Sequence, residues 1–170
     1  MIYFFVGQSN TGKSQKAEEL AMTFGSFHRL YIATMKVMDE DGERRVQKHR
    51  KQRAGKGFET LEIPMNITEV IPQIKDPENT VVLLECVSNL VGNEMYDNPE
   101  KAELEEAHFA EEIVQDIKRL GDSVAELIVV SSEYEAKEEY SEDTLKYIRY
   151  LDRTNEEIKR IAHKVIEIGI

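Results

Sequence analysis

The 170-residue chain carries 22 Lys and Arg residues against 33 Asp and Glu residues, a formal net charge of −11. This acidic balance argues against a general nucleic-acid-binding protein. A transmembrane helix needs about 20 apolar residues, and no apolar run in the sequence approaches that length. The length predicts one domain over residues 1–170, and the content of 41% hydrophobic and 32% charged residues is typical of a soluble globular protein.

The N-terminal segment predicts a strand, a phosphate-binding loop and a helix. Residues 2–6 (Ile-Tyr-Phe-Phe-Val) form an apolar run typical of a buried strand. The next eight residues, Gly7-Gln8-Ser9-Asn10-Thr11-Gly12-Lys13-Ser14, fit the pattern G-x-x-x-x-G-K-[ST]. Apolar residues then recur at helical spacing (Ala17, Leu20, Ala21, Phe24), with Lys16, Glu18 and Glu19 expected on the opposite face. No basic segment precedes the strand, so we expect no signal peptide.

This arrangement has a direct chemical meaning. A loop between a strand and a helix aims backbone N–H groups and the positive end of the helix dipole at one point, where they hold a di- or triphosphate. Lys13 would reach the β- and γ-phosphates, and the Ser14 hydroxyl would bind Mg²⁺. The alternative is a chance glycine-rich turn.

A second strand is expected over residues 28–33, followed by a polar helix over residues 35–53. A basic cluster begins within this helix and extends just past its end. It consists of Arg44, Arg45, Lys48, Arg50, Lys51, Arg53 and Lys56, with His49 among them. In an acidic protein, such a cluster indicates either a local anion site or a solvated helix face.

Residues 58–63 alternate with period two, which predicts a strand with one exposed face, and Asn66 could cap a short helix that ends near Ile74. Residues 80–85 predict a buried strand that ends at Glu85. Because ligands bind at the carboxyl ends of parallel strands, Glu85 is a candidate Mg²⁺ ligand; the alternative is a surface charge. Cys86 is the only cysteine, which excludes an internal disulfide and favours a reducing, cytoplasmic location.

The C-terminal half predicts a helix from Asn98-Pro99 to Leu120, ended by Gly121, and a strand over residues 125–130. Residues 133–143 are expected to form a loop or an exposed helix end, and a helix capped by Ser141 and a strand over residues 164–168 complete the chain. Alternating strands and helices predict an α/β fold of the P-loop NTPase type, a mainly parallel sheet with helices on both faces.

His49 is the candidate second reactive centre. A histidine among lysines and arginines is commonly a surface residue. Alternatively, neighbouring cations disfavour protonation of the ring, and a neutral imidazole is a nucleophile that could attack the α-phosphate of a nucleotide.

Five segments together resemble a known family. They are the phosphate loop, residues 31–34 (Y-I-A-T), residues 45–53 (family pattern R-I-x-x-H-[RK]-x-x-R), residues 60–62 (T-x-E) and residues 83–86 (L-L-[DE]-C). Over residues 1–96 the chain resembles the bifunctional adenosylcobinamide kinase/adenosylcobinamide-phosphate guanylyltransferases of cobalamin biosynthesis. After residue 131 it departs from the family pattern, and the family's G-I-V-P element is not visible.

The resemblance implies phosphorylation of adenosylcobinamide by ATP or GTP, followed by GMP transfer from GTP through His49 to the corrinoid phosphate. It implies a homotrimer, and it places a set of residues near the guanine nucleotide: Ala33, Thr34, Met35, Arg50, Lys51, Gln52, Arg53, Glu62 and Glu85. Two alternatives are a small-metabolite kinase that uses only the phosphate loop and a non-catalytic nucleotide-binding switch.

Overall fold

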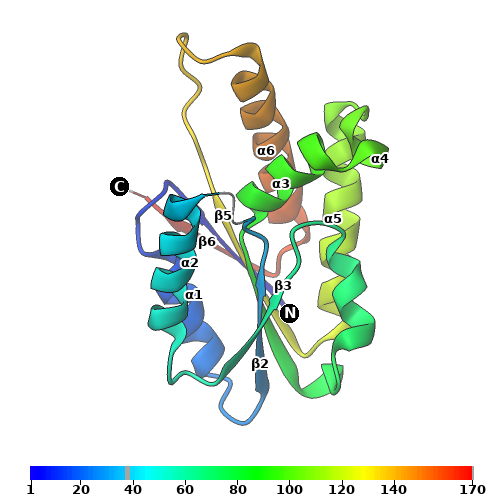
Figure 1. The fold of residues 1–170 in the computed structure, drawn as a ribbon. Helices are drawn as coiled ribbons and strands as arrows, with labels where there is room; N and C mark the ends of the chain where they lie inside the picture. Colours follow the sequence, from blue (N-terminus) through cyan, green and yellow to red (C-terminus); the bar gives the residue numbers. More distant parts are fainter. Residues whose placement is uncertain (37–38, 170) are drawn as a thin grey trace.

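The computed structural model describes residues 1–36 and 39–169 (Figure 1). Its centre is a six-stranded sheet in the order β3-β2-β4-β5-β1-β6, and every strand pair is parallel. The strands are β1 (Ile2–Gly7), β2 (His28–Ala33), β3 (Phe58–Glu62), β4 (Thr80–Glu85), β5 (Glu126–Ser132) and β6 (Lys164–Ile168). Each predicted strand is confirmed, with shifts of one or two residues at some ends.

Helices cover both faces of this sheet. Helix α1 (Lys13–Met22) packs on one face, and α3 (Val87–Asp97), α5 (Glu106–Ser123) and α6 (Glu142–Ile161) lie on the other (Figure 1). Helix α2 (Glu40–Arg53) lies beside α1, and the short α4 (Pro99–Ala102) follows α3. Two 3₁₀ helices, η1 (Ile67–Gln73) and η2 (Pro77–Asn79), precede β4. The α/β fold with a parallel sheet and helices on both faces is therefore confirmed.

Several predicted helix details are wrong. Helix α3 was not predicted. The expected helix from Pro99 to Leu120 is two helices, and Gly121 lies inside α5 instead of ending it. Asn66 precedes η1 in a left-handed conformation and makes no side-chain cap. The helix predicted from residue 35 begins at Glu40, and residues 37–38 lie outside the described part.

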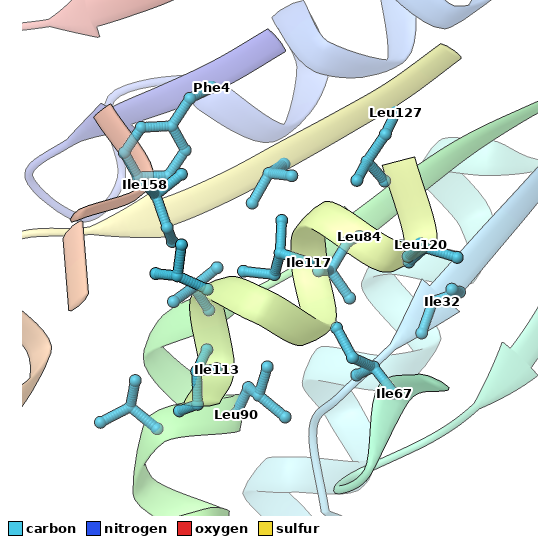
Figure 2. Close-up of a cluster of buried hydrophobic side chains, with 14 of the residues drawn as sticks. Phe4, Ile32, Ile67, Leu84, Leu90, Ile113, Ile117, Leu120, Leu127 and Ile158 are labelled. Carbon is cyan, nitrogen blue, oxygen red and sulfur yellow. The ribbon is translucent and has the colours of Figure 1, made fainter. Parts of the chain in front are cut away.

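The larger core lies between the sheet and the α3, α5 and α6 layer. Its side chains come from the sheet (Phe4, Ile32, Leu84, Leu127), from η1 (Ile67) and from the helices (Leu90, Ile113, Ile117, Leu120, Ile158), as Figure 2 shows. A smaller cluster beneath α1 contains Ala17, Ala21, Phe5, Tyr31 and Leu83. Burial on both faces explains why the central strands are continuous apolar runs and not alternating sequences.

Strand direction determines where the polar residues gather. Because all six strands are parallel, the phosphate loop after β1, Thr34 after β2, Glu62, Glu85 and Glu133 lie along the same edge of the sheet. Strand β5 lies between β1 and β4, so Glu85 is two strands away from the start of the phosphate loop. Side chains must span this distance if Glu85 and the phosphate loop are to act on one ligand.

Candidate functional site

The phosphate loop joins β1 to α1 as the sequence predicts. Asn10 and Gly12 both adopt positive φ, at 61° and 82°. Inside the loop, the Lys13 Nζ donates to the Gln8 carbonyl at 2.5 Å, and the Thr11 hydroxyl donates to the same oxygen at 2.8 Å. Burial lowers the pKa of Lys13, while Cys86 and the Glu85 and Glu133 carboxylates act in the opposite direction. The loop is thus folded around its lysine, which lies within the field of the carboxylates at the sheet edge.

A buried carboxylate joins the loop helix to the basic helix. Glu18 of α1 is 1% exposed and accepts a hydrogen bond from Gln52 Nε2 of α2, with Lys56 Nζ 3.6 Å away. The same amide lies 3.5 Å from the Ser14 hydroxyl oxygen. The sequence places Glu18 on the helix face away from the apolar stripe, and the structure buries it beneath α2, where it holds the basic helix beside the phosphate loop.

His49 faces a carboxylate. Its Nδ1 lies 3.6 Å from Oε2 of Glu85, and the ring is about one-third exposed (34%). The Tyr31 hydroxyl donates to the same Glu85 oxygen at 2.5 Å. Glu85 Oε1 is buried and has no hydrogen-bond partner among the described residues. The sequence interpretation considered only the cations near His49, whereas the structure adds an acidic partner contributed by β4.

The end of α2 carries two differently placed arginines. Arg50 is exposed and contacts Glu62 Oε1 of β3 at 3.1 Å. Arg53 is buried, with its guanidinium 3.6 Å from the centre of the Tyr31 ring and Nη1 without a partner among the described residues. A cavity of about 520 Å³ adjoins both; it is lined by Arg50, Arg53, Ala54, Gly55, Gly57, Phe58 and Thr60. Of the two alternatives for the basic cluster, Arg53 favours an anion site.

The remaining expected residues divide into two groups. Thr34 is fully buried and joins β2 to the end of β4, because its hydroxyl donates to the Cys86 carbonyl at 2.7 Å and accepts from the Cys86 N–H. Ala33 bonds Ile63 through its carbonyl. Met35 and Lys51 lie near the same edge, but neither makes a side-chain hydrogen bond or ion pair among the described residues.

Sequence reasoning missed three parts of the site. Tyr31 appeared only as a strand residue within the Y-I-A-T segment and was given no role, although its hydroxyl donates to the Glu85 carboxylate. The burial of Glu18 beneath α2 was not predicted. The third part is a cavity of about 440 Å³ next to the loop; its lining consists of Gln8, Glu133, Tyr134, Glu135, Asp152, Asn155 and Glu156. Only the adjacency of Glu133 to the end of a predicted strand could have indicated this cavity.

In residues 1–36 and 39–169, no helix is both long and apolar enough to cross a bilayer.

Comparison with solved structures supports the fold. A solved ATPase domain superposes with a TM-score of 0.59 at 12% identity, covering 98% of this chain and 68% of that one. The flagellar accessory protein FlaH from Methanocaldococcus jannaschii gives a TM-score of 0.50 at 15% identity, covering 98% and 70%. At these identities the likeness concerns the fold alone.

Comparison at the sequence level is more specific. The chain is 36% identical over 97 residues to the bifunctional adenosylcobalamin biosynthesis protein CobU of Escherichia coli (strain K12). That match covers 57% of this chain and 51% of the relative, so it spans about half the length of the curated protein. The model of the CobU family, described as cobinamide kinase / cobinamide phosphate guanyltransferase, matches residues 3–168. Because this match covers nearly the whole chain, the protein belongs to the cobinamide kinase / cobinamide phosphate guanyltransferase family.

Proposed function

We propose that this protein phosphorylates adenosylcobinamide and then transfers GMP from GTP, through His49, to the resulting phosphate. The observation that carries the proposal is the presence of two reactive centres at one edge of the sheet. Lys13 lies in the phosphate loop, and His49 faces Glu85 from the adjoining helix. A phosphate loop alone accounts for one phosphoryl transfer, whereas a histidine beside a carboxylate adds a nucleophile.

In the first step, the loop holds the triphosphate of ATP or GTP and Lys13 stabilises the charge on its β- and γ-phosphates. The hydroxyl of the aminopropanol arm attacks the γ-phosphorus, and the bond to the β-phosphate oxygen breaks. The protein contributes mainly by positioning the two reactants, because a well-oriented bound pair avoids most of the entropic cost of the encounter. Lys13 is oriented for this role by the Gln8 carbonyl, which the phosphates would replace as its partner.

The donors around the loop fit a magnesium ion. Glu85 keeps one buried carboxylate oxygen, Oε1, without a protein partner among the described residues, and Ser14 supplies a hydroxyl at the start of α1. Oxygen donors of this kind suit Mg²⁺, which takes only one or two protein ligands beside phosphates and water. We assign Ser14 and Glu85 as the residues that would hold the ion; when bound, it would neutralise charge on the phosphates.

In the second step, His49 attacks the α-phosphorus of GTP and pyrophosphate leaves. The phosphate of adenosylcobinamide phosphate then attacks the guanylyl group and frees His49. Arg50, Lys51, Gln52 and Arg53, with Ala33, Thr34, Met35 and Glu62, would surround the nucleotide. The cavity beside Arg50 and Arg53 supports this assignment, because it offers a buried guanidinium with an unused N–H group. In this scheme the phosphate loop would serve both steps.

The test is covalent labelling. Incubation with GTP labelled at the α-phosphate should leave GMP on the wild-type protein, with the acid-labile, base-stable linkage of a phosphoramidate. His49→Ala should abolish the label, while His108→Ala, a variant of a well-exposed histidine on α5, should retain it.

The kinase step is measured separately, as phosphorylation of adenosylcobinamide. Lys13→Ala should abolish it. Triphosphate-dependent phosphorylation without any covalent label would contradict guanylyl transfer and favour a kinase that uses only the phosphate loop. Nucleotide binding without either reaction would favour a non-catalytic switch.

The assembly and location remain part of the proposal. We propose a cytoplasmic homotrimer, as the family resemblance implies. Light scattering of the purified protein tests the trimer, and a mass corresponding to the 19.6 kDa monomer would contradict it.

A further inference from the structure

We infer that Tyr31 is a positioning residue for guanylyl transfer: it holds the Glu85 carboxylate against Nδ1 of His49, so that Nε2 attacks the α-phosphorus. This inference rests on the proposed function, since it assigns atoms and a supporting residue to the second step.

The first support is the geometry at one carboxylate oxygen. Oε2 of Glu85 accepts from the Tyr31 hydroxyl at 2.5 Å and lies 3.6 Å from Nδ1 of His49. Strands β2 and β4 are neighbours, with Tyr31 paired to Leu83, two residues before Glu85. Since alternate residues of a strand point to the same face, Tyr31, Leu83 and Glu85 all face the layer of α1 and α2. The pairing of the two strands therefore brings the phenol to the carboxylate.

The second support is the restraint on Tyr31 itself. The residue is 4% exposed, and its ring lies between the Arg53 guanidinium, 3.6 Å from the ring centre, and Phe58, which packs edge-on at 6.3 Å. These contacts hold the ring in place, with its hydroxyl directed at the Glu85 carboxylate, to which it donates.

The third support comes from the basic helix. His49 and Arg53 are four residues apart on α2, so they lie on the same helix face. One contacts the Glu85 carboxylate and the other covers the ring of Tyr31. Tyr31 and Glu85 thus form one docking surface for this face of α2, and the position of the His49 ring depends on both.

The chemistry follows from which nitrogen faces the carboxylate. With its proton on Nδ1, directed at Glu85, the neutral ring carries its lone pair on Nε2. Attack forms the Nε2–P bond and breaks the bond between the α-phosphorus and the bridging oxygen, and pyrophosphate leaves with that electron pair. The ring becomes positively charged, keeps its Nδ1 proton and is stabilised by Glu85, as a carboxylate stabilises an imidazolium in other nucleophile–base arrangements. When the corrinoid phosphate attacks, the Nε2–P bond breaks and its electron pair returns to Nε2.

The distance of 3.6 Å between Nδ1 of His49 and Oε2 of Glu85 is longer than a hydrogen bond. Catalytic hydrogen bonds are commonly long in the absence of substrate and shorten in the reacting complex. Because Tyr31 already holds the Glu85 carboxylate, only the His49 ring would have to move to shorten this distance.

The experiment compares rates of GMP labelling in a single turnover for the wild type, Tyr31→Phe, Glu85→Gln and the double variant. Loss of an outer partner of a metal-binding histidine typically costs about 10- to 100-fold, and we expect a fall of this order for Tyr31→Phe, which likewise loses the partner of a group that holds a histidine. The GTP concentration giving half-maximal rate should change by less than about twofold, and phosphorylation of adenosylcobinamide should be retained. If Tyr31 acts through Glu85, the double variant should be no slower than Glu85→Gln alone.

Tyr150→Phe is the matched control. Its hydroxyl donates to the Leu104 carbonyl at 2.9 Å on the α6 side of the molecule, so its loss should leave the labelling rate unchanged. A Tyr31→Phe labelling rate within twofold of the wild type would overturn the inference. So would additive losses in the double variant, or a parallel fall of labelling and phosphorylation.

A second measurement needs no variant. NMR of the guanylylated protein, with ¹⁵N in the histidine rings, identifies the nitrogen bonded to phosphorus. An Nε2–P bond supports the inference and an Nδ1–P bond overturns it, even if Tyr31→Phe fails to fold. A wild-type protein that takes no label overturns the proposed function and the inference together, whereas a labelled wild type with an unaffected Tyr31→Phe overturns the inference alone.

Discussion

Gly7 offers a sharp test of how the phosphate loop is held. It is both the first residue of the loop motif and the last residue of β1, where it pairs with Ile168 of β6. A Cβ atom at this position would lie 2.0 Å from the Ile168 carbonyl oxygen and 3.0 Å from its carbonyl carbon. Because these are backbone atoms, no side-chain rotation can relieve the overlap. In Gly7→Ala, the end of β6 must therefore move away from β1 by about 1 Å or more.

Overpacking of this kind typically costs about 1–3 kcal/mol. For a chain of this size, each kcal/mol lowers Tm by about 2–4 °C, so we expect Gly7→Ala to melt roughly 2–12 °C below the wild type. The increase of Tm on adding GTP should also be smaller, since Gly7, where the strain arises, is the first residue of the phosphate loop. Circular dichroism melts with and without GTP measure both effects.

Gly169→Ala is the matched control, because nothing lies within 4 Å of the added Cβ atom. It should change stability by no more than about 0.5 kcal/mol, as surface substitutions usually do. A Gly7→Ala protein that melts within about 1 °C of the wild type, or no lower than Gly169→Ala, would refute the argument from close strand approach.

Three further predictions concern the part of the chain after residue 85. Asn155→Ala should lower the free energy of unfolding by about 1–3 kcal/mol in urea titrations, because the buried amide bonds the Ser131 hydroxyl and the Ser132 carbonyl; an unchanged midpoint would contradict this. Burial, then the charges of Glu133 and neighbouring carboxylates, raises the pKa of Asp152, so its ionised form destabilises the fold. Asp152→Asn should therefore raise Tm at neutral pH, and the gain should vanish as the pH falls below the ordinary range of aspartate; a gain that persists in acid would contradict this cause. Desolvation also raises the pKa of the half-buried Cys86 thiol, so this thiol should react slowly with Ellman's reagent in the native protein and rapidly in denaturant, and equal rates would contradict the raised pKa.

The predictions that were confirmed rest on neighbours in the sequence. The phosphate loop is eight consecutive residues between an apolar strand and a helix, so its pattern and both flanks can be identified without knowing the rest of the fold. The same holds for Ser141, whose hydroxyl accepts from the Thr144 N–H at 3.2 Å three residues later. The missed helix α3 also had a local signal, since Val87, Leu90 and Val91 recur at helical spacing and are buried.

Other features depend on which distant segments meet. Nothing local to β4 indicates that β5 separates it from β1, so Glu85 could be expected near the phosphate loop but not placed two strands away. Glu18 is a charged residue of the type usually exposed on a helix, and only the packing of α2 against α1 buries it.

The sequence by itself thus determined the parallel α/β framework, the phosphate loop and the identity of its lysine and serine, because hydrophobic periodicity and loop motifs are properties of consecutive residues. Only the tertiary structure decided that His49 faces Glu85 and that Tyr31 holds this carboxylate. These contacts join β2, β4 and α2, and Tyr31 and Glu85 are 54 positions apart along the chain. Strand order and helix packing bring them together, and neither is encoded in the spacing within any one segment.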